Sequence, residues 1–195
     1  MKYVVIVNGK PQSGKTTFQE MCSDMIDKAE IAYPHIVSTI DPIKNLYRQL
    51  GWNGEKTDKA RKDLSVLKQM WIDNCDGPTK FIVKFLIELD NESDHVVFVD
   101  VREENEIDKL TDVLGALKPL DIDWYTILIE RPDMDGMEYG NKSDDNVSMD
   151  ESLYTHHIIN GSDLQTLRSI AVSVMCDIMD TNIIRDILEE EIEND

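Results

Sequence analysis

Residues 9–16 carry the pattern G-x-x-x-x-G-K-[ST], and this segment constrains the fold of the chain more than any other. Its two glycines let backbone N–H groups curl around a phosphate, and a helix that starts at the second glycine adds a favourable dipole. A short apolar run at residues 3–7 precedes the pattern, and apolar residues at helical spacing follow it. We therefore predict a strand, a phosphate-binding loop (P-loop) and a helix. The residues expected to bind the phosphates of ATP are Gly9, Lys10, Pro11, Gln12, Ser13, Gly14, Lys15, Thr16 and Thr17.

Short apolar runs alternate with helical patterns along the rest of the chain. The runs expected to form strands are residues 3–7, 36–40, 96–100, 124–130 and 157–160. This alternation predicts an α/β fold, namely the three-layer P-loop NTPase fold with a five-stranded parallel sheet. We expect a single domain over residues 1–195, with a core formed by 1–51 and 92–195 and a helical substrate-binding insertion at about 52–91. Residues 131–152 lack an apolar period and are predicted to form a lid loop.

The chain is strongly acidic, with 20 Lys and Arg residues against 39 Asp and Glu residues and a formal net charge of -19. This disfavours binding to nucleic-acid polymers and to anionic membranes, because both depend on basic surfaces. No stretch reaches the roughly 20 apolar residues of a membrane-spanning helix, and the N-terminus is predicted to carry no export signal. Cys22, Cys75 and Cys176 have neither disulfide nor zinc spacing. We expect a cytoplasmic protein, monomeric or homodimeric, whose partner is a small-molecule nucleotide substrate.

The ends of two further predicted strands, residues 96–100 and 124–130, are followed or closed by charged residues that would complete a phosphate site. An apolar run ends in Asp100, which is predicted to hold Mg²⁺ together with Thr16. Arg102 lies two residues further on and would project toward the phosphates. Arg131 follows the fourth predicted strand, where it could place positive charge on a transferring phosphoryl group. Lys15, Arg102 and Arg131 are therefore the predicted catalytic residues.

Two further segments resemble nucleoside monophosphate kinases. The segment Ser38-Thr39-Ile40-Asp41-Pro42-Ile43-Lys44 is similar to the adenylate kinase segment Ser-Thr-Gly-Asp-x-Leu-Arg. Residues 41–44 and 100–106 more closely resemble the bacteriophage deoxynucleoside monophosphate kinase family. That family shows Asp-Pro-Leu-Lys and Asp-Val-Arg-x-x-Asn-Glu at these points, where this chain reads Asp-Pro-Ile-Lys and Asp-Val-Arg-Glu-Glu-Asn-Glu. The resemblance spans roughly residues 3–178 but is specific only in these segments and the P-loop.

The resemblance implies transfer of the γ-phosphoryl group of ATP, with Mg²⁺, to a (deoxy)nucleoside monophosphate. Because the basic residue of the adenylate kinase segment contacts the acceptor monophosphate, the resemblance gives that role to Lys44. The residues expected to bind the acceptor are Asp41, Lys44, Arg48, Arg61 and Arg102. The chain departs from the pattern at two points. Family P-loops often carry Asp after the lysine, where this chain has Thr16, and Lys142 is the single basic residue between Arg131 and Ser152.

Two other functions fit the same motifs. One is a P-loop kinase for another small acceptor, such as phosphomevalonate or dephospho-coenzyme A. The other is a nucleotide-binding regulator that binds ATP without transferring its phosphate. Residues 141–144 also spell N-K-x-D, the guanine-reading pattern of GTPases, but they lie inside a polar loop and not at a strand end. We interpret that match as coincidence.

Overall fold

The centre of the protein is a five-stranded, fully parallel sheet with the strand order β2-β3-β1-β4-β5. The computed structural model describes residues 1–55, 57–117, 120–132, 150–161 and 163–187. The strands are β1 (Lys2–Asn8), β2 (Tyr33–Ser38), β3 (His95–Asp100), β4 (Ile122–Glu130) and β5 (His156–Ile159). The P-loop follows the central strand, so it lies in the middle of the carboxyl edge of the sheet.

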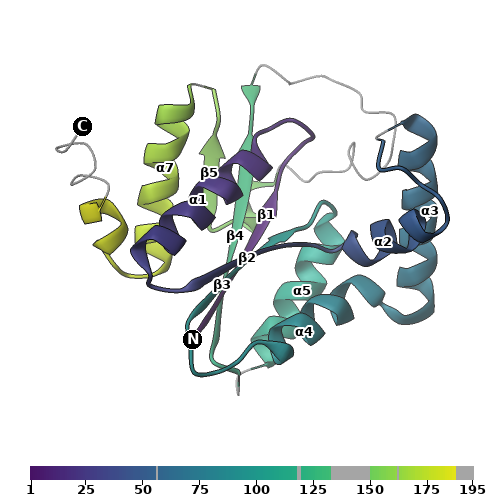
Figure 1. Cartoon of the computed structure of the whole chain (residues 1–195), viewed down its shortest axis with the longest axis horizontal. Coiled ribbons are helices and arrows are strands. Elements are labelled where there is room, and N and C mark those ends of the chain that lie inside the picture. The colour runs from purple at the N-terminus through teal and green to yellow at the C-terminus, as the bar shows by residue number, and fades with distance from the viewer. Residues whose placement is uncertain (56, 118–119, 133–149, 162, 188–195) are drawn as a thin grey trace.

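Helices cover both faces of this sheet (Figure 1). On one face lie α1 (Lys15–Ala29) and α7 (Leu164–Ile178), and on the other lie α4 (Gly77–Glu88) and α5 (Glu104–Ala116). Two more helices, α2 (Asp41–Gln49) and α3 (Asp58–Cys75), follow β2, and the short helix η3 (Glu151–Leu153) precedes β5. This arrangement confirms the predicted three-layer P-loop NTPase fold with a five-stranded parallel sheet.

The apolar side chains of β1 explain why the sheet needs both helical layers. Val5 and Val7 belong to the core under α1 and α7, whereas Val4 and Ile6 belong to the core under α4 and α5. All four side chains are fully buried. Because successive residues of a strand point to opposite faces, a strand covered on both sides must be apolar at every position. The continuous apolar run in the sequence is the consequence.

The second strand differs from its prediction at both ends. It was expected at residues 36–40, but β2 begins at Tyr33 and ends at Ser38. Tyr33 is 59% exposed, because β2 is an edge strand, and an edge position also tolerates Pro34. Asp41 is the first residue of α2 and its carboxylate accepts a hydrogen bond from the Ser38 backbone N–H at 2.8 Å. It therefore closes the turn that connects β2 to α2.

The segment 52–91, predicted as a substrate-binding insertion, contains two helices with different surroundings. Ile82 and Leu86 of α4 are fully buried in the core against Val97 and Val99 of β3. The helix α3 has only two buried residues, Ala60 and Lys68. Thus α4 is part of the layer that covers the sheet, and α3 is the helix of this segment that remains for a substrate site. No helix of the described ranges is long and apolar enough to cross a membrane.

Candidate active site

The P-loop connects β1 to α1 in a conformation that needs both of its glycines. Gly9 has φ 146° and Gly14 has φ 101°, values that side chains rarely tolerate. A Cβ atom at Gly9 would lie 2.3 Å from the backbone oxygen of Ile129, and one at Gly14 would lie 2.3 Å from Nδ2 of Asn160. The Asn160 amide donates a hydrogen bond to the backbone oxygen of Ser13 at 2.8 Å. The end of β5 therefore holds the P-loop in place.

Lys15 is the first residue of α1, and its side chain folds back over the loop. Its ammonium group donates hydrogen bonds to the backbone oxygens of Gly9 at 2.6 Å and Lys10 at 2.8 Å. The first turn of α1 contains no acidic residue, so the positive end of the helix dipole is not neutralised there. A helix start with backbone N–H groups and a lysine is a site for the phosphates of a nucleotide.

Asp100 ends β3, which pairs with the P-loop strand β1, and lines the same cleft as Lys15. It accepts a hydrogen bond from the Gln19 amide at 3.2 Å. Burial raises the pKa of Asp100 above its ordinary value, and the positive charges of Lys15 and Arg102 oppose that rise. In the described part of the chain, no group of three or more His, Cys, Asp or Glu residues could hold a metal ion. Asp100 and Thr16 line the same cleft, and this carboxylate and hydroxyl suit Mg²⁺ that takes its other ligands from phosphates and water.

A cleft of about 590 Å³, here called the donor cleft, runs along the P-loop. Six of the nine predicted phosphate-binding residues line it: Pro11, Gln12, Gly14, Lys15, Thr16 and Thr17. The other three, Gly9, Lys10 and Ser13, belong to the loop but do not line the cleft. Arg131 lines the cleft from the end of β4, and Leu164 and Leu167 line it from the start of α7. The donor cleft therefore combines a polar, cationic region with an apolar wall.

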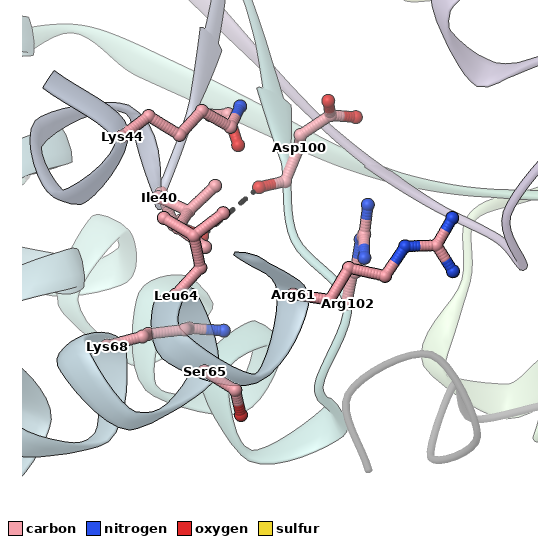
Figure 2. Close-up of a pocket in the computed structure, with 10 residues that line it drawn as sticks. Ile40, Lys44, Arg61, Leu64, Ser65, Lys68, Asp100 and Arg102 are labelled. Atoms are coloured by element: carbon pink, nitrogen blue, oxygen red, sulfur yellow. Dashed lines mark hydrogen bonds between the residues drawn. The ribbon is translucent and has the colours of Figure 1, made fainter. Parts of the chain in front are cut away.

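A smaller pocket of about 130 Å³, here called the acceptor pocket, adjoins the donor cleft (Figure 2). Its walls come from the end of β2, the start of α2, one face of α3 and the end of β3. The lining residues are Ser38, Thr39, Ile40, Lys44, Arg61, Leu64, Ser65, Lys68, Asp100 and Arg102. Arg61, Asp100 and Arg102 line both cavities. A group bound in one cavity would therefore meet a group bound in the other at these three side chains.

The residues predicted to bind an acceptor do not all reach this pocket. Lys44, Arg61 and Arg102 line it, and Asp41 pairs with the Lys44 ammonium at 2.9 Å. Arg48 lines neither of the two cavities. Its guanidinium lies 5.5 Å from the ring centre of Trp52 and donates a hydrogen bond to the Asn45 side chain at 2.9 Å. Most of the predicted lid, residues 133–149 with Lys142, lies outside the described residues.

Asn8 is a residue of the site that the sequence pattern did not single out. Its side chain is fully buried directly before the P-loop. The carbonyl oxygen of the side chain accepts a hydrogen bond from the Gly9 backbone N–H at 2.7 Å. The amide group donates to the Tyr154 hydroxyl at 2.7 Å and to the backbone oxygen of Arg102 at 3.4 Å. Asn8 thus connects the P-loop, the β3–α5 turn and the segment that enters β5.

Comparisons with known proteins identify the fold. No known protein family and no curated protein sequence matches this chain. A structure of the Mycobacterium tuberculosis APS kinase CysC in complex with AMPPNP and APS is 13% identical to this chain and has a TM-score of 0.51. The match covers 92% of this chain and 98% of the APS kinase chain. Thymidylate kinase from Ehrlichia chaffeensis is 14% identical with coverages of 89% and 98% and a TM-score of 0.45. Shikimate kinase from Bacteroides thetaiotaomicron is 14% identical with coverages of 91% and 98% and a TM-score of 0.41. The likeness to APS kinase shows that this chain has the fold of a P-loop kinase.

Proposed function

We propose that this protein transfers the γ-phosphoryl group of ATP to the phosphate of a nucleoside or deoxynucleoside monophosphate, with Mg²⁺. One observation carries the proposal. In a chain with a net charge of -19, two arginines, Arg61 and Arg102, line the acceptor pocket against one acidic side chain, Asp100. Lys44 and Lys68 line it as well, each paired with carboxylates that are not part of the lining. The overall field repels anions, so a local concentration of positive charge is what an anionic acceptor requires. A phosphate group is an acceptor of this kind.

The connection between the two cavities supports transfer from one phosphate to another. An acceptor phosphate is already ionised near neutral pH, so its attack on the γ-phosphorus needs no strong base. Catalysis then depends on alignment and on neutralising charge on the transferring group. Arg61 and Arg102 line both cavities and would contact both phosphates during transfer. Lys15 would turn from the loop carbonyls to the phosphates of ATP.

Mg²⁺ bound with ATP would neutralise the β- and γ-phosphates, and Thr16 and Asp100 are the residues that would hold it. The electrostatic environment of Asp100 fits this role, because a divalent cation favours the ionised carboxylate that burial disfavours. Arg131, which also lines the donor cleft, would approach the γ-phosphate. Lys44, held by Asp41, would bind the acceptor phosphate.

The test is a panel of acceptors with purified protein and MgATP. ADP release is measured with each common ribonucleoside and deoxyribonucleoside monophosphate, and with phosphomevalonate and dephospho-coenzyme A. We expect one or more monophosphates to stimulate ADP release strongly, and Lys15→Ala to abolish the stimulation. Lys28→Ala is the matched control, because Lys28 is another lysine of α1 but pairs with Asp24 at the far end of the helix. Stimulation only by the other two acceptors would refute the proposed acceptor, and ATP binding without any stimulation would favour a regulator.

A further inference from the structure

Lys68 differs from the other basic residues of the acceptor pocket in its surroundings. It is a lysine with only 6% of its surface exposed. Its ammonium group donates a hydrogen bond to Glu103 at 3.0 Å and another to Glu106 at 2.8 Å, and both carboxylates lie at the start of α5. An ammonium group has three N–H donors. Two are used by these carboxylates, so among the described residues one remains for a group that enters the pocket.

The three residues Lys68, Glu103 and Glu106, here called the inner cluster, carry no net positive charge. One ammonium faces two carboxylates, which gives a formal charge of -1 when both are ionised. Glu106 is buried, and its second carboxylate oxygen has no hydrogen-bond partner in the described part of the chain. Burial also raises the pKa of Glu106, and the charge of Lys68 only partly opposes that rise. A second anion at this point would meet a lysine that two carboxylates outside the pocket lining already neutralise.

Lys68 and Arg61 lie at different ends of the pocket. Arg61, Leu64, Ser65 and Lys68 form one face of α3, as their spacing of three, four and seven residues requires. Seven residues of helix rise about 10 Å, which separates the backbone positions of Arg61 and Lys68. Figure 2 shows Lys68 and Ser65 on one side, with Arg61 and Arg102 extending away from them. The pocket therefore has two arginines where it joins the donor cleft and a charge-balanced lysine at its inner end.

We infer that the inner cluster selects acceptors that are anionic at one end and uncharged at the other, with Lys68 donating a hydrogen bond to the uncharged end. The inference rests on the proposed function and makes these three residues determinants of its specificity. A nucleoside monophosphate fits this description. Its phosphate is the anionic end, and its nucleobase is an uncharged end with hydrogen-bond acceptors for Lys68. An acceptor such as phosphomevalonate does not, because it carries a carboxylate far from its phosphate.

The experiment compares two acceptors that differ by one charge on the base. For a pyrimidine substrate the pair is the monophosphate and its 5-carboxy derivative, and for a purine it is dGMP and deoxyxanthosine 5′-monophosphate, whose base ionises near neutral pH. We expect the wild-type protein to prefer the uncharged base by about a hundredfold in kcat/KM, since like charges in a partly buried site cost several kcal/mol. Glu103→Gln/Glu106→Gln keeps the shape of the inner cluster but leaves the charge of Lys68 unbalanced. This variant should reduce the preference at least tenfold.

Two further variants separate selection from folding. Lys68→Met removes the ammonium group that would bind the uncharged end of the acceptor and should raise the KM of the uncharged acceptor about tenfold or more without changing the KM of ATP. Adding both glutamines to Lys68→Met should restore part of that KM. Glu88→Gln removes the exposed pair between Glu88 and Lys84 on α4 and should change none of these values. A preference that stays the same in the Glu103→Gln/Glu106→Gln variant would overturn the inference, whereas a lack of any nucleotide acceptor would overturn the proposed function itself.

Discussion

The contact between Gly14 and Asn160 allows a quantitative test of how the P-loop is held. In Gly14→Ala the new side chain adopts φ 101°, which costs about 1–3 kcal/mol of backbone strain. Its Cβ atom would lie 2.3 Å from Nδ2 of Asn160, so the amide must move away. That movement breaks the 2.8 Å hydrogen bond to Ser13, which contributes about 1 kcal/mol. The free energy of unfolding should therefore fall by about 2–4 kcal/mol in total.

The double variant separates the two contributions. Asn160→Ala alone loses the hydrogen bond to Ser13 and should cost about 1 kcal/mol. In Gly14→Ala/Asn160→Ala the same hydrogen bond is lost only once, so the loss should equal that of Gly14→Ala. The sum of the two single losses should thus exceed the loss in the double variant by about 1 kcal/mol. A coupling of this size is expected for residues in contact.

Urea unfolding of the four proteins at constant pH measures these free energies, and ATP binding is measured in parallel. ATP binding should weaken in both variants that contain Gly14→Ala, because the strained position lies in the P-loop itself. Gly115→Ala is the control, since Gly115 lies in α5 with ordinary contact distances to Trp124. It should stabilise the protein by up to about 1 kcal/mol. Strictly additive losses in the double variant would refute the reasoning, since they would mean that Asn160 does not move when Gly14 gains a side chain.

Two further predictions concern charge. Arg102→Ala should lower kcat by roughly a thousandfold and leave ATP affinity nearly unchanged, because Arg102 lies where the two cavities join. Arg48→Ala is the control: this side chain lines neither cavity, so kcat and ATP affinity should stay unchanged. Parallel losses of kcat and ATP affinity in Arg102→Ala would contradict that position. The pKa of the Glu106 carboxyl is raised, so this group holds its proton more strongly in the folded protein than in the unfolded chain. At low pH the buried group is protonated and its burial is tolerated. As pH rises above about 4.5, the burial of Glu106 lowers the free energy of unfolding. The stability of Glu106→Gln relative to the wild type, followed by urea unfolding from pH 4.5 to 8, should therefore increase with pH, and a constant difference would show that Glu106 is not destabilised by burial.

The features that the sequence predicted are those set by local patterns. The P-loop follows from the spacing of Gly9, Gly14 and Lys15, because a tight turn before a helix start needs those residue types in that order. The central strands were predicted because burial on both faces leaves a continuous apolar run. The edge strand β2 begins three residues before its predicted start, since Tyr33 is exposed and Pro34 only partly buried, and neither carries such a signal.

The parts that could not be predicted depend on contacts between distant segments. Asn8 donates a hydrogen bond to Tyr154, 146 positions away, and Asn160 donates one to Ser13, 147 positions away, so both amides have partners that only the folded chain brings together. Lys68 is one of several lysines in a polar helix, and nothing in its spacing shows that two glutamates of α5 bury it. Arg48 and Lys44 lie one turn apart on α2, yet only Lys44 faces the pocket. Orientation around a helix axis depends on the neighbours against which the helix packs.

The hydrogen bond between Tyr154 and Asn8 ties separate parts of the active site to one buried amide. Tyr154 lies two residues before β5, and Asn8 lies directly before the P-loop. The same amide group also donates to the backbone oxygen of Arg102. Because a buried polar group that loses a partner is costly, a substitution at Tyr154 acts on the P-loop and on the turn of Arg102 without touching a nucleotide. Tyr154 thus supports the architecture of the site although it lines neither cavity.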